Sequence, residues 1–227
     1  MGSPISEPER DDDEVQHQVT ISRDFWLGKY EVTQAQWKAV MGNNPSHFKK
    51  FFKRGDNNPV EQVRWEDAKN FCDKLNSDSS ISRPSGYRFD LPTEAQWEFA
   101  CRGGNQSRNY LYSGSNTPGN VAWYELGYDI GKTNPVGQKS PNELGFHDMS
   151  GNVSEWCRDW YGDYPSNSVT DPHGTPSGSR HVFRGGSFGY IASCCRAADR
   201  FTFSPEYWGP SPRDSTLGFR LALVPEP

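Results

Sequence analysis

Three glycine-containing blocks in the last third of the chain constrain its fold more than any other feature. Residues 145–156 read GFHDMSGNVSEW, residues 183–187 read FRGGS and residues 217–220 read LGFR. Glycine permits tight turns and close approach of backbones, so these blocks favour short strands joined by turns. Residues 188–216, which we call the framed segment, differ from the blocks because they are rich in aromatic residues and in Gly, Ser and Pro. The pattern predicts a frame that carries a chemically distinct segment.

The composition predicts a single domain with many loops. Only 33% of the 227 residues are hydrophobic, but the chain contains 8 Trp, 10 Tyr and 13 Phe. Each aromatic side chain buries a large area, so a core can form from few residues. With 22 Gly and 17 Pro, much of the backbone must lie in turns. Neither a linker nor a repeat at a fixed period divides the chain, so we expect one domain over residues 17–224.

The charge and the cysteines exclude several classes of protein. The formal net charge is −5 and no basic block occurs, so no nucleic acid is expected as a partner. No apolar run approaches the roughly 20 residues that a membrane-spanning helix needs. The five cysteines include no CxxC pair, which argues against a zinc site. Because no coiled-coil pattern occurs, a monomer is the expected state.

The first 16 residues are polar and acidic, with the run DDDE at residues 11–14. Such a run predicts a disordered lead-in over residues 1–16, and the opening MGS is typical of a cloning-derived start. No signal peptide is recognisable. We therefore expect that an export signal of the native protein has been removed.

The coarse secondary structure is that of an α+β protein with its helices early. Residues 17–21 and 25–32 alternate as strands do. A helix is expected over residues 34–41, after Thr33 as N-cap and before Gly42. A second helix, residues 65–76, has one apolar stripe, and a third begins at a capping box formed by Thr93 and Gln96. After residue 103 the sequence predicts only turns and short strands.

Several blocks match one protein family in order along nearly the whole chain. Besides the blocks above, they are EVTQAQW at 31–37, NPV at 58–60, LPTEAQWE at 91–98 and GNV at 119–121. The chain resembles the formylglycine-generating-enzyme (sulfatase-modifying-factor) domain over residues 17–224. The resemblance implies a C-type lectin fold of the formylglycine-generating-enzyme subtype, an α+β fold with short helices, a small twisted antiparallel sheet and high loop content. It implies function less firmly, because one fold carries many activities.

The oxidase members of this family have two cysteines, three and eight residues after the Ser of Gly-Gly-Ser, which bind copper. Here Ser187 is followed at these distances by Tyr190 and Cys195. A cuprous ion prefers two soft thiolates, and a phenol replaces one of them poorly. We therefore expect no enzymatic activity and no copper. Sulfoxide synthases of the family hold iron with three histidines, and the five histidines here are dispersed without an HxH or HxxxH pair.

The framed segment is similar in position and content to the hypervariable region of retroelement-diversified variable proteins, above all the treponemal ones. In those proteins adenine-directed mutation turns Asn codons into NNY codons. The framed segment contains no Asn, Lys, Gln or Met, and only Glu206 and Trp208 fall outside the residues that NNY encodes. The resemblance implies that residues 188–216 form a variable ligand-binding region.

The residue types of the framed segment also predict a binding surface. Contiguous exposed aromatic area marks an interaction site, and Tyr and Trp give large contact area at low entropic cost. Phe188 and Phe201 fit the core of the domain equally well. The expected ligand-binding residues are Phe188, Tyr190, Ile191, Ser193, Cys194, Phe201, Phe203, Glu206, Tyr207, Trp208, Ser211, Asp214 and Ser215.

The resemblance also implies a structural calcium ion near the GNVSEW block. By position its ligands would be the side chains of Asp148 and Glu155 and the backbone oxygens of Gly151 and Val153. The alternative is that Asp148 and Glu155 hold the turn through hydrogen bonds without a metal. The EPN and QPD triplets of sugar-binding lectins are absent, so calcium-dependent sugar recognition is not expected.

These observations predict a non-enzymatic display scaffold that recognises a protein or another cell-surface ligand. Its expected location is the cell surface or the outer membrane, as a lipoprotein. Two alternatives stay open. One is a formylglycine-generating-type oxidoreductase that acts on a substrate cysteine, and the other is a binding domain of the same fold with a fixed ligand.

Overall fold

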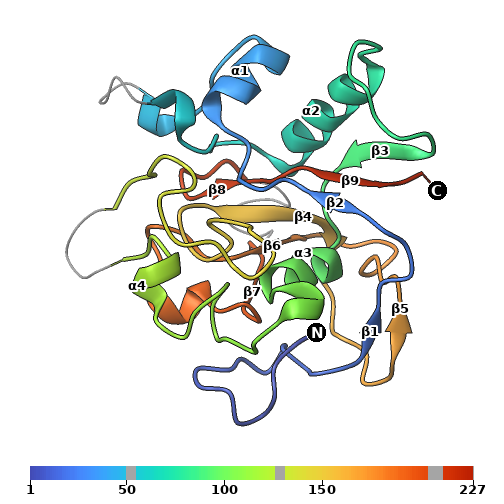
Figure 1. Cartoon of the computed structure of the whole chain (residues 1–227), viewed down its shortest axis with the longest axis vertical. Helices are drawn as coiled ribbons and strands as arrows, with labels where there is room; N and C mark the ends of the chain where they lie inside the picture. Colours follow the sequence, from blue (N-terminus) through green and yellow to red (C-terminus); the bar gives the residue numbers. More distant parts are fainter. Residues whose placement is uncertain (50–54, 126–130, 204–211, 227) are drawn as a thin grey trace.

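The computed structural model describes residues 1–49, 55–125, 131–203 and 212–226 (Figure 1). The three helices expected from N-caps and apolar periodicity are present. Helix α1 (Gln34–Met41) starts at a capping box between Thr33 and Gln36 and ends at Gly42, whose φ of 79° is left-handed. Helix α2 (Trp65–Ser77) buries the stripe Ala68, Phe71, Cys72 and Leu75. Helix α3 (Glu94–Cys101) starts at the predicted capping box.

The structure adds short helical turns that the sequence analysis missed. Helix α4 (Pro118–Val121) has four residues and begins with proline at its first turn. The 3₁₀ turns are η1 (His47–Lys49), η2 (Gly55–Asn57), η3 (Gly104–Gln106) and η4 (Ala192–Cys195). The prediction of only strands and turns after residue 103 is therefore wrong, because helices of one turn are too short to show an apolar period.

Small sheets form the centre of the molecule. The largest has the order β7-β6-β4-β8, with β4 (Ser154–Trp160) and β6 (His181–Arg184) in the middle and β7 (Arg200–Phe201) and β8 (Leu217–Gly218) at the edges. A second sheet has the order β2-β9-β3, from β2 (Trp26–Leu27), β9 (Ala222–Pro225) and β3 (Tyr87–Asp90). A third pairs β1 (Val19–Thr20) with β5 (Val169–Thr170). The α+β class with short helices and high loop content is confirmed.

Two strand pairs depart from the expected antiparallel pattern. Strands β4 and β8 pair in parallel, and so do β1 and β5. The two predicted N-terminal strands are also shorter than expected. Within residues 17–21 and 25–32, strand pairing is limited to β1 with β5 and to β2 with β9.

Helices cover the sheets from two sides. Figure 1 shows α1 and α2 above the strands β4 and β9 and α3 below these two strands. Trp37 of α1 stacks on Phe71 of α2 at 5.5 Å, and Phe219 meets both rings edge-on. On the other side, Trp97 of α3 packs in a cluster with Met149 and Cys157. Aromatic rings thus supply the core that the low apolar content left in question.

The N-terminal segment is part of the fold, which corrects the expected disordered lead-in over residues 1–16. Ser3 and Glu14 are 1% and 0% exposed. The Glu14 carboxylate accepts hydrogen bonds from the Ser3 hydroxyl at 2.6 Å and from Arg196 at 2.5 Å and 3.0 Å. The backbone N–H of Gly2 donates to Glu98. The acidic run meets cations that are remote in sequence, so its composition alone was misleading.

The described residues include no helix that is long and apolar enough to cross a membrane. Cys72, Cys101, Cys157 and Cys195 are buried free thiols, as expected for Cys72 and Cys101, whereas Cys194 is half-buried.

The fully buried pair of Glu155 and Arg220 gives the first prediction. Arg220 donates twice to Glu155 at 2.6 Å, and both residues are 0% exposed. Glu155→Gln leaves the guanidinium without its counterion, so we expect the free energy of unfolding in urea to fall by about 3–5 kcal/mol. The control is Arg213→Gln, which removes a partly exposed pair with Asp67 and should cost less than about 1 kcal/mol. Equal losses would contradict this assignment.

Candidate functional site

Two glycines of the FRGGS block lie just before the framed segment. Gly185 and Gly186 follow β6 with φ of 93° and 64°, conformations that glycine adopts without strain. A Cβ on Gly186 would lie 2.5 Å from the carbonyl oxygen of Cys194 and 2.8 Å from the sulfur of Cys195. Only glycine therefore lets the chain return this closely on itself, and the FRGGS block has a geometric reason.

The middle of the framed segment is core and not surface. Residues 195–200 are all buried, and Ala197 and Ala198 are 0% exposed. The carbonyl oxygens of Ala197 and Ala198 accept hydrogen bonds from the buried Arg184 at 2.8 Å and 2.9 Å. We call residues 195–200 the buried spine. None of its six residues was among the expected ligand contacts.

The buried spine is fixed by ion pairs to distant segments. Arg196 pairs with Glu14 and with Glu7. Arg200 donates to both carboxylate oxygens of Glu94 in α3, at 2.7 Å and 3.0 Å. Its guanidinium also lies 3.6 Å over the ring of Tyr164. These contacts fix the position of the buried spine, so the residues on either side of it are attached to a rigid segment.

The two flanks of the buried spine reach the surface. Ile191 is 57% exposed, which is unusual for a large apolar side chain. The other expected ligand contacts that are partly exposed are Tyr190, Ser193, Cys194, Phe201, Phe203, Asp214 and Ser215. Residues 189–194 form one flank and residues 201–203 with 213–216 form the other. We call these two flanks the display surface.

An aromatic stack ties the display surface to the core. Tyr190 stacks on Phe201 at 5.5 Å and 9°, and Phe201 stacks on Phe183 of β6 at 5.5 Å and 13°. Phe203 packs against Phe183 at 4.8 Å. Burial and the nearby carboxylate of Asp214 raise the pKa of the Tyr190 phenol. One face of Tyr190 is therefore used internally, and less of it is available to a ligand than the sequence suggested.

Phe188 takes the core alternative, so its assignment as a ligand contact is wrong. It is 6% exposed and meets Phe48 edge-on at 5.4 Å. Gly131 lies so close that a Cβ there would be 2.7 Å from the Phe188 carbonyl oxygen. The remaining expected contacts, Glu206, Tyr207, Trp208 and Ser211, lie outside the described residues.

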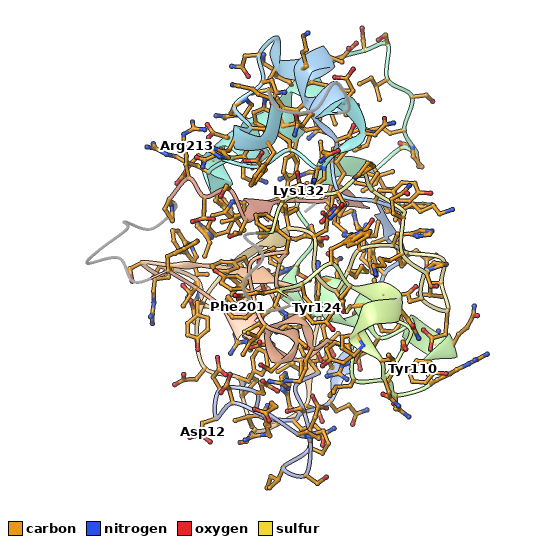
Figure 2. All side chains as sticks on the ribbon, turned by 90° about the vertical axis from the view of Figure 1, so that its left-hand side faces the viewer. Asp12, Tyr110, Tyr124, Lys132, Phe201 and Arg213 are labelled. Carbon is orange, nitrogen blue, oxygen red and sulfur yellow. The ribbon has the colours of Figure 1, made fainter. Side chains whose placement is uncertain are left out.

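Two further residues contribute to this face of the molecule. The backbone N–H of Glu125 donates to the carbonyl oxygen of Tyr190 at 2.8 Å, which brings Tyr124 beside the first flank. Figure 2 looks onto this side and shows Tyr124 and Phe201 near the middle, with Arg213 above them. Arg213 is exposed and belongs to the framed segment. The sequence analysis missed both residues, although an Arg among exposed aromatics is typical of binding surfaces.

Cys195 and Tyr190 occupy the two positions at which the oxidase members have cysteines. Cys195 is 0% exposed, and burial raises the pKa of its thiol. Its sulfur faces the carbonyl oxygen of Ile191 at 3.9 Å. Tyr190, at the place of the other cysteine, is stacked on Phe201. Because the thiolate and not the thiol binds metals, this environment disfavours a copper site.

The side chain of Glu155 is already engaged at the expected calcium site. Its oxygens accept hydrogen bonds from Arg220 and from the indole of Trp97, all at 2.6 Å. Oε2 accepts two of these bonds and Oε1 accepts one. Glu155 is therefore held by hydrogen bonds, and Oε1 keeps one lone pair that could bind a cation.

Asp148 differs from Glu155 because it has a free oxygen. Its Oδ2 accepts from the N–H of Gly137 at 2.6 Å, whereas its Oδ1 is buried without a partner. Burial raises the pKa of Asp148, and Glu155 adds to the shift. The neighbouring Glu31 is fully buried, and its pKa is raised well above the usual range by burial and by Asp148 and Glu155. Asp148 Oδ1 is thus the oxygen of the two expected carboxylates that has no hydrogen-bond partner at all.

Comparison with known proteins places the chain among relatives with and without enzymatic names. Residues 1–224 match the family described as the sulfatase-modifying factor enzyme 1-like domain. The match includes residues 1–16, which contribute the buried Ser3 and Glu14. The chain is 38% identical over 220 residues to the chaperone protein LppX of Paenibacillus barcinonensis, with 77% of this chain and 72% of the relative covered.

Two further similar proteins are an enzyme and a protein of known structure. The formylglycine-generating enzyme of Streptomyces coelicolor is 35% identical over 184 residues, covering 73% of this chain and 52% of the enzyme. The chain thus spans about half the length of that enzyme. The structure of Treponema denticola variable protein 1 superimposes with a TM-score of 0.74 at 36% identity, covering 88% of this chain and 84% of the other.

Replacing Asp148 tests the calcium prediction. Asp148 has a φ of 57°, which Asn tolerates well. In buffer with EDTA, we expect Asp148→Asn to raise the free energy of unfolding by roughly 1 kcal/mol. The substitution removes a buried negative charge that lies near Glu31 and whose Oδ1 has no hydrogen-bond partner. Calorimetric melting measures this, with the exposed Asp12→Asn as control. If millimolar calcium stabilises the original protein and not the variant, Asp148 binds calcium.

Proposed function

Because the chain belongs to the sulfatase-modifying factor enzyme 1-like family, we propose that it is a non-enzymatic scaffold whose display surface binds a protein or another cell-surface ligand. The observation that carries the proposal is the division of the described residues 189–203 and 213–216 into a buried spine and two partly exposed flanks. The spine is fixed by ion pairs of Arg196 and Arg200, and the flanks present Ile191 and part of Tyr190 and Phe201. Substitutions in the flanks would leave the frame intact.

The similarity to Treponema denticola variable protein 1 supports a finer proposal, in which a retroelement diversifies the flanks. A protein whose surface residues vary needs a supporting core that does not depend on the varying residues. The buried spine offers such a base, because its contacts are made by residues 195–200 and not by the flanks. We further propose a monomer located at the cell surface or the outer membrane as a lipoprotein.

Deep sequencing of the codons for residues 188–216 across a source population tests diversification. We expect substitutions at Tyr190, Ile191, Ser193 and Phe201, and almost none at residues 195–200, because changes there break buried ion pairs. A near-identical repeat in the flanking DNA should carry adenines at the varying positions. Uniform codons without a repeat would contradict diversification and favour a binding domain with a fixed ligand. Variation that is as frequent in the spine as in the flanks would contradict the division into spine and flanks.

The alternative function is an oxidoreductase of the formylglycine-generating type, which the 35% identity to such an enzyme favours. It would act on a substrate cysteine and would depend on Cys195. The buried thiol of Cys195 and the stacked ring at Tyr190 favour the scaffold over this alternative.

Cuprous-ion titration against a chromogenic chelator separates the two functions. We expect the original protein and Cys195→Ser to compete equally weakly, because one buried thiol is a poor site for copper. Tyr190→Cys restores the two-cysteine pattern and serves as the positive control. Stoichiometric copper binding by the original protein that is lost in Cys195→Ser would establish the oxidoreductase alternative instead.

A further inference from the structure

A cavity of about 320 Å³ lies on a different part of the molecule from the display surface. Its walls come from residues 159–175, which include β5, from the start of α3 and from the N-terminal segment. Figure 1 shows β5 and β1 together at one edge of the molecule, away from α4. The apolar part of the wall includes Trp160, Tyr164 and Pro172. The proposed binding function does not use this cavity.

Asp159 lines the cavity and has no counterion. It is 4% exposed, and its Oδ2 accepts the backbone N–H of Glu94 at 2.9 Å. Among the described residues, no Lys, Arg or His side chain forms an ion pair with Asp159. Glu94 lines the same cavity but is paired with Arg184 and Arg200. Asp159 is therefore the buried carboxylate here whose charge is not balanced.

The other charged groups around the cavity form no ion pair with Asp159 among the described residues. The guanidinium of Arg200 donates to Glu94, to the Gly162 carbonyl oxygen and to the Asp13 carbonyl oxygen. Asp163 adds a second negative charge at the rim, where it is exposed.

The remaining titratable groups are already bonded or point elsewhere. The amino group of Met1 donates to the His17 carbonyl oxygen at 3.1 Å. The guanidinium of Arg158 extends toward Asp90, at 3.9 Å. The His17 ring bonds the Val15 carbonyl oxygen, and burial lowers the pKa of His173, which favours its neutral form near neutral pH. Among the charged groups that line the cavity, the carboxylates of Glu94, Asp159 and Asp163 outnumber the Met1 ammonium and the Arg200 guanidinium.

We propose that this cavity binds a primary ammonium group on a short apolar chain, with Asp159 as its counterion. A buried carboxylate such as Asp159 attracts a cation more strongly than one at the surface. Trp160, Tyr164 and Pro172 contact the aliphatic part of the ligand, in the usual combination of apolar walls and one placed polar group. A small amine and the side chain of a lysine residue share this chemistry.

The affinity should depend on pH with a defined sign. Burial and the charge of Glu94 raise the pKa of Asp159 to about 7. Below this pH the carboxyl group is mostly protonated and neutral, and above it the group is ionised. The ammonium ion stays charged over this range. Binding should therefore strengthen as the pH rises through 7.

NMR titration with n-butylammonium at pH 6 and at pH 8 tests the proposal. We expect binding at pH 8 that is several-fold weaker at pH 6 and at least about tenfold weaker in Asp159→Asn. The amide can still accept the N–H of Glu94, so the variant should fold, which its melting temperature checks. The exposed Asp163→Asn is the matched control and should change the affinity by less than about threefold.

Butyrate and n-butanol are the comparison ligands, and neither should bind as well as n-butylammonium. Equal binding of n-butanol, or unchanged binding by a folded Asp159→Asn, would overturn the proposal, and so would the absence of any n-butylammonium binding at pH 8. Nα-acetyl-lysine amide distinguishes the source of the ligand. If it binds with the same dependence on Asp159, a lysine side chain fits, and if only the free amine does, the ligand is a small amine.

Discussion

Buried pairs between arginine and carboxylate side chains are the interaction on which the structure depends. Arg184 joins the strand β6 to α3, and Arg196 joins the framed segment to the N-terminal segment. Arg220 joins the end of the chain to β4. The strands are short and provide few ladder hydrogen bonds, so directional contacts between remote segments must fix how the loops are arranged. A buried pair contributes mostly in this way, because desolvation offsets much of its attraction, whereas the loss of one partner is costly.

The same pairs explain how a surface can be exposed and rigid at once. Arg196 and Arg200 are inside the framed segment and pair with buried carboxylates, while Ile191 beside the buried spine is exposed and Tyr190 and Phe201 are partly exposed. Aromatic stacking through Phe201 extends this support to Tyr190. Antibody binding sites likewise place adaptable residues on a rigid base. In the proposed function, the buried spine therefore meets the requirements of folding and the two flanks meet those of recognition.

Local sequence was sufficient wherever the deciding interaction was local. The capping boxes at Thr33 and Thr93 and the apolar stripe of α2 depend on residues three or four positions apart, and the structure has these elements where the sequence placed them. Helix α4 was missed because one turn leaves no period to detect. The acidic N-terminal segment was misjudged because its partner, Arg196, is 182 residues away from Glu14. A run of like charges looks unstructured until its counterions are known.

By itself, the sequence determined the α+β class, the three main helices and the family, because caps, apolar periods and ordered blocks depend on neighbouring residues. Only the tertiary structure decided how the buried charges pair. Glu155 pairs with Arg220, 65 residues away, whereas Asp159 forms no ion pair with any residue in the described part of the chain. It also placed Phe188 in the core. The energy of a charge or a ring depends on burial and on its nearest partner, and both are set by the folded chain in three dimensions.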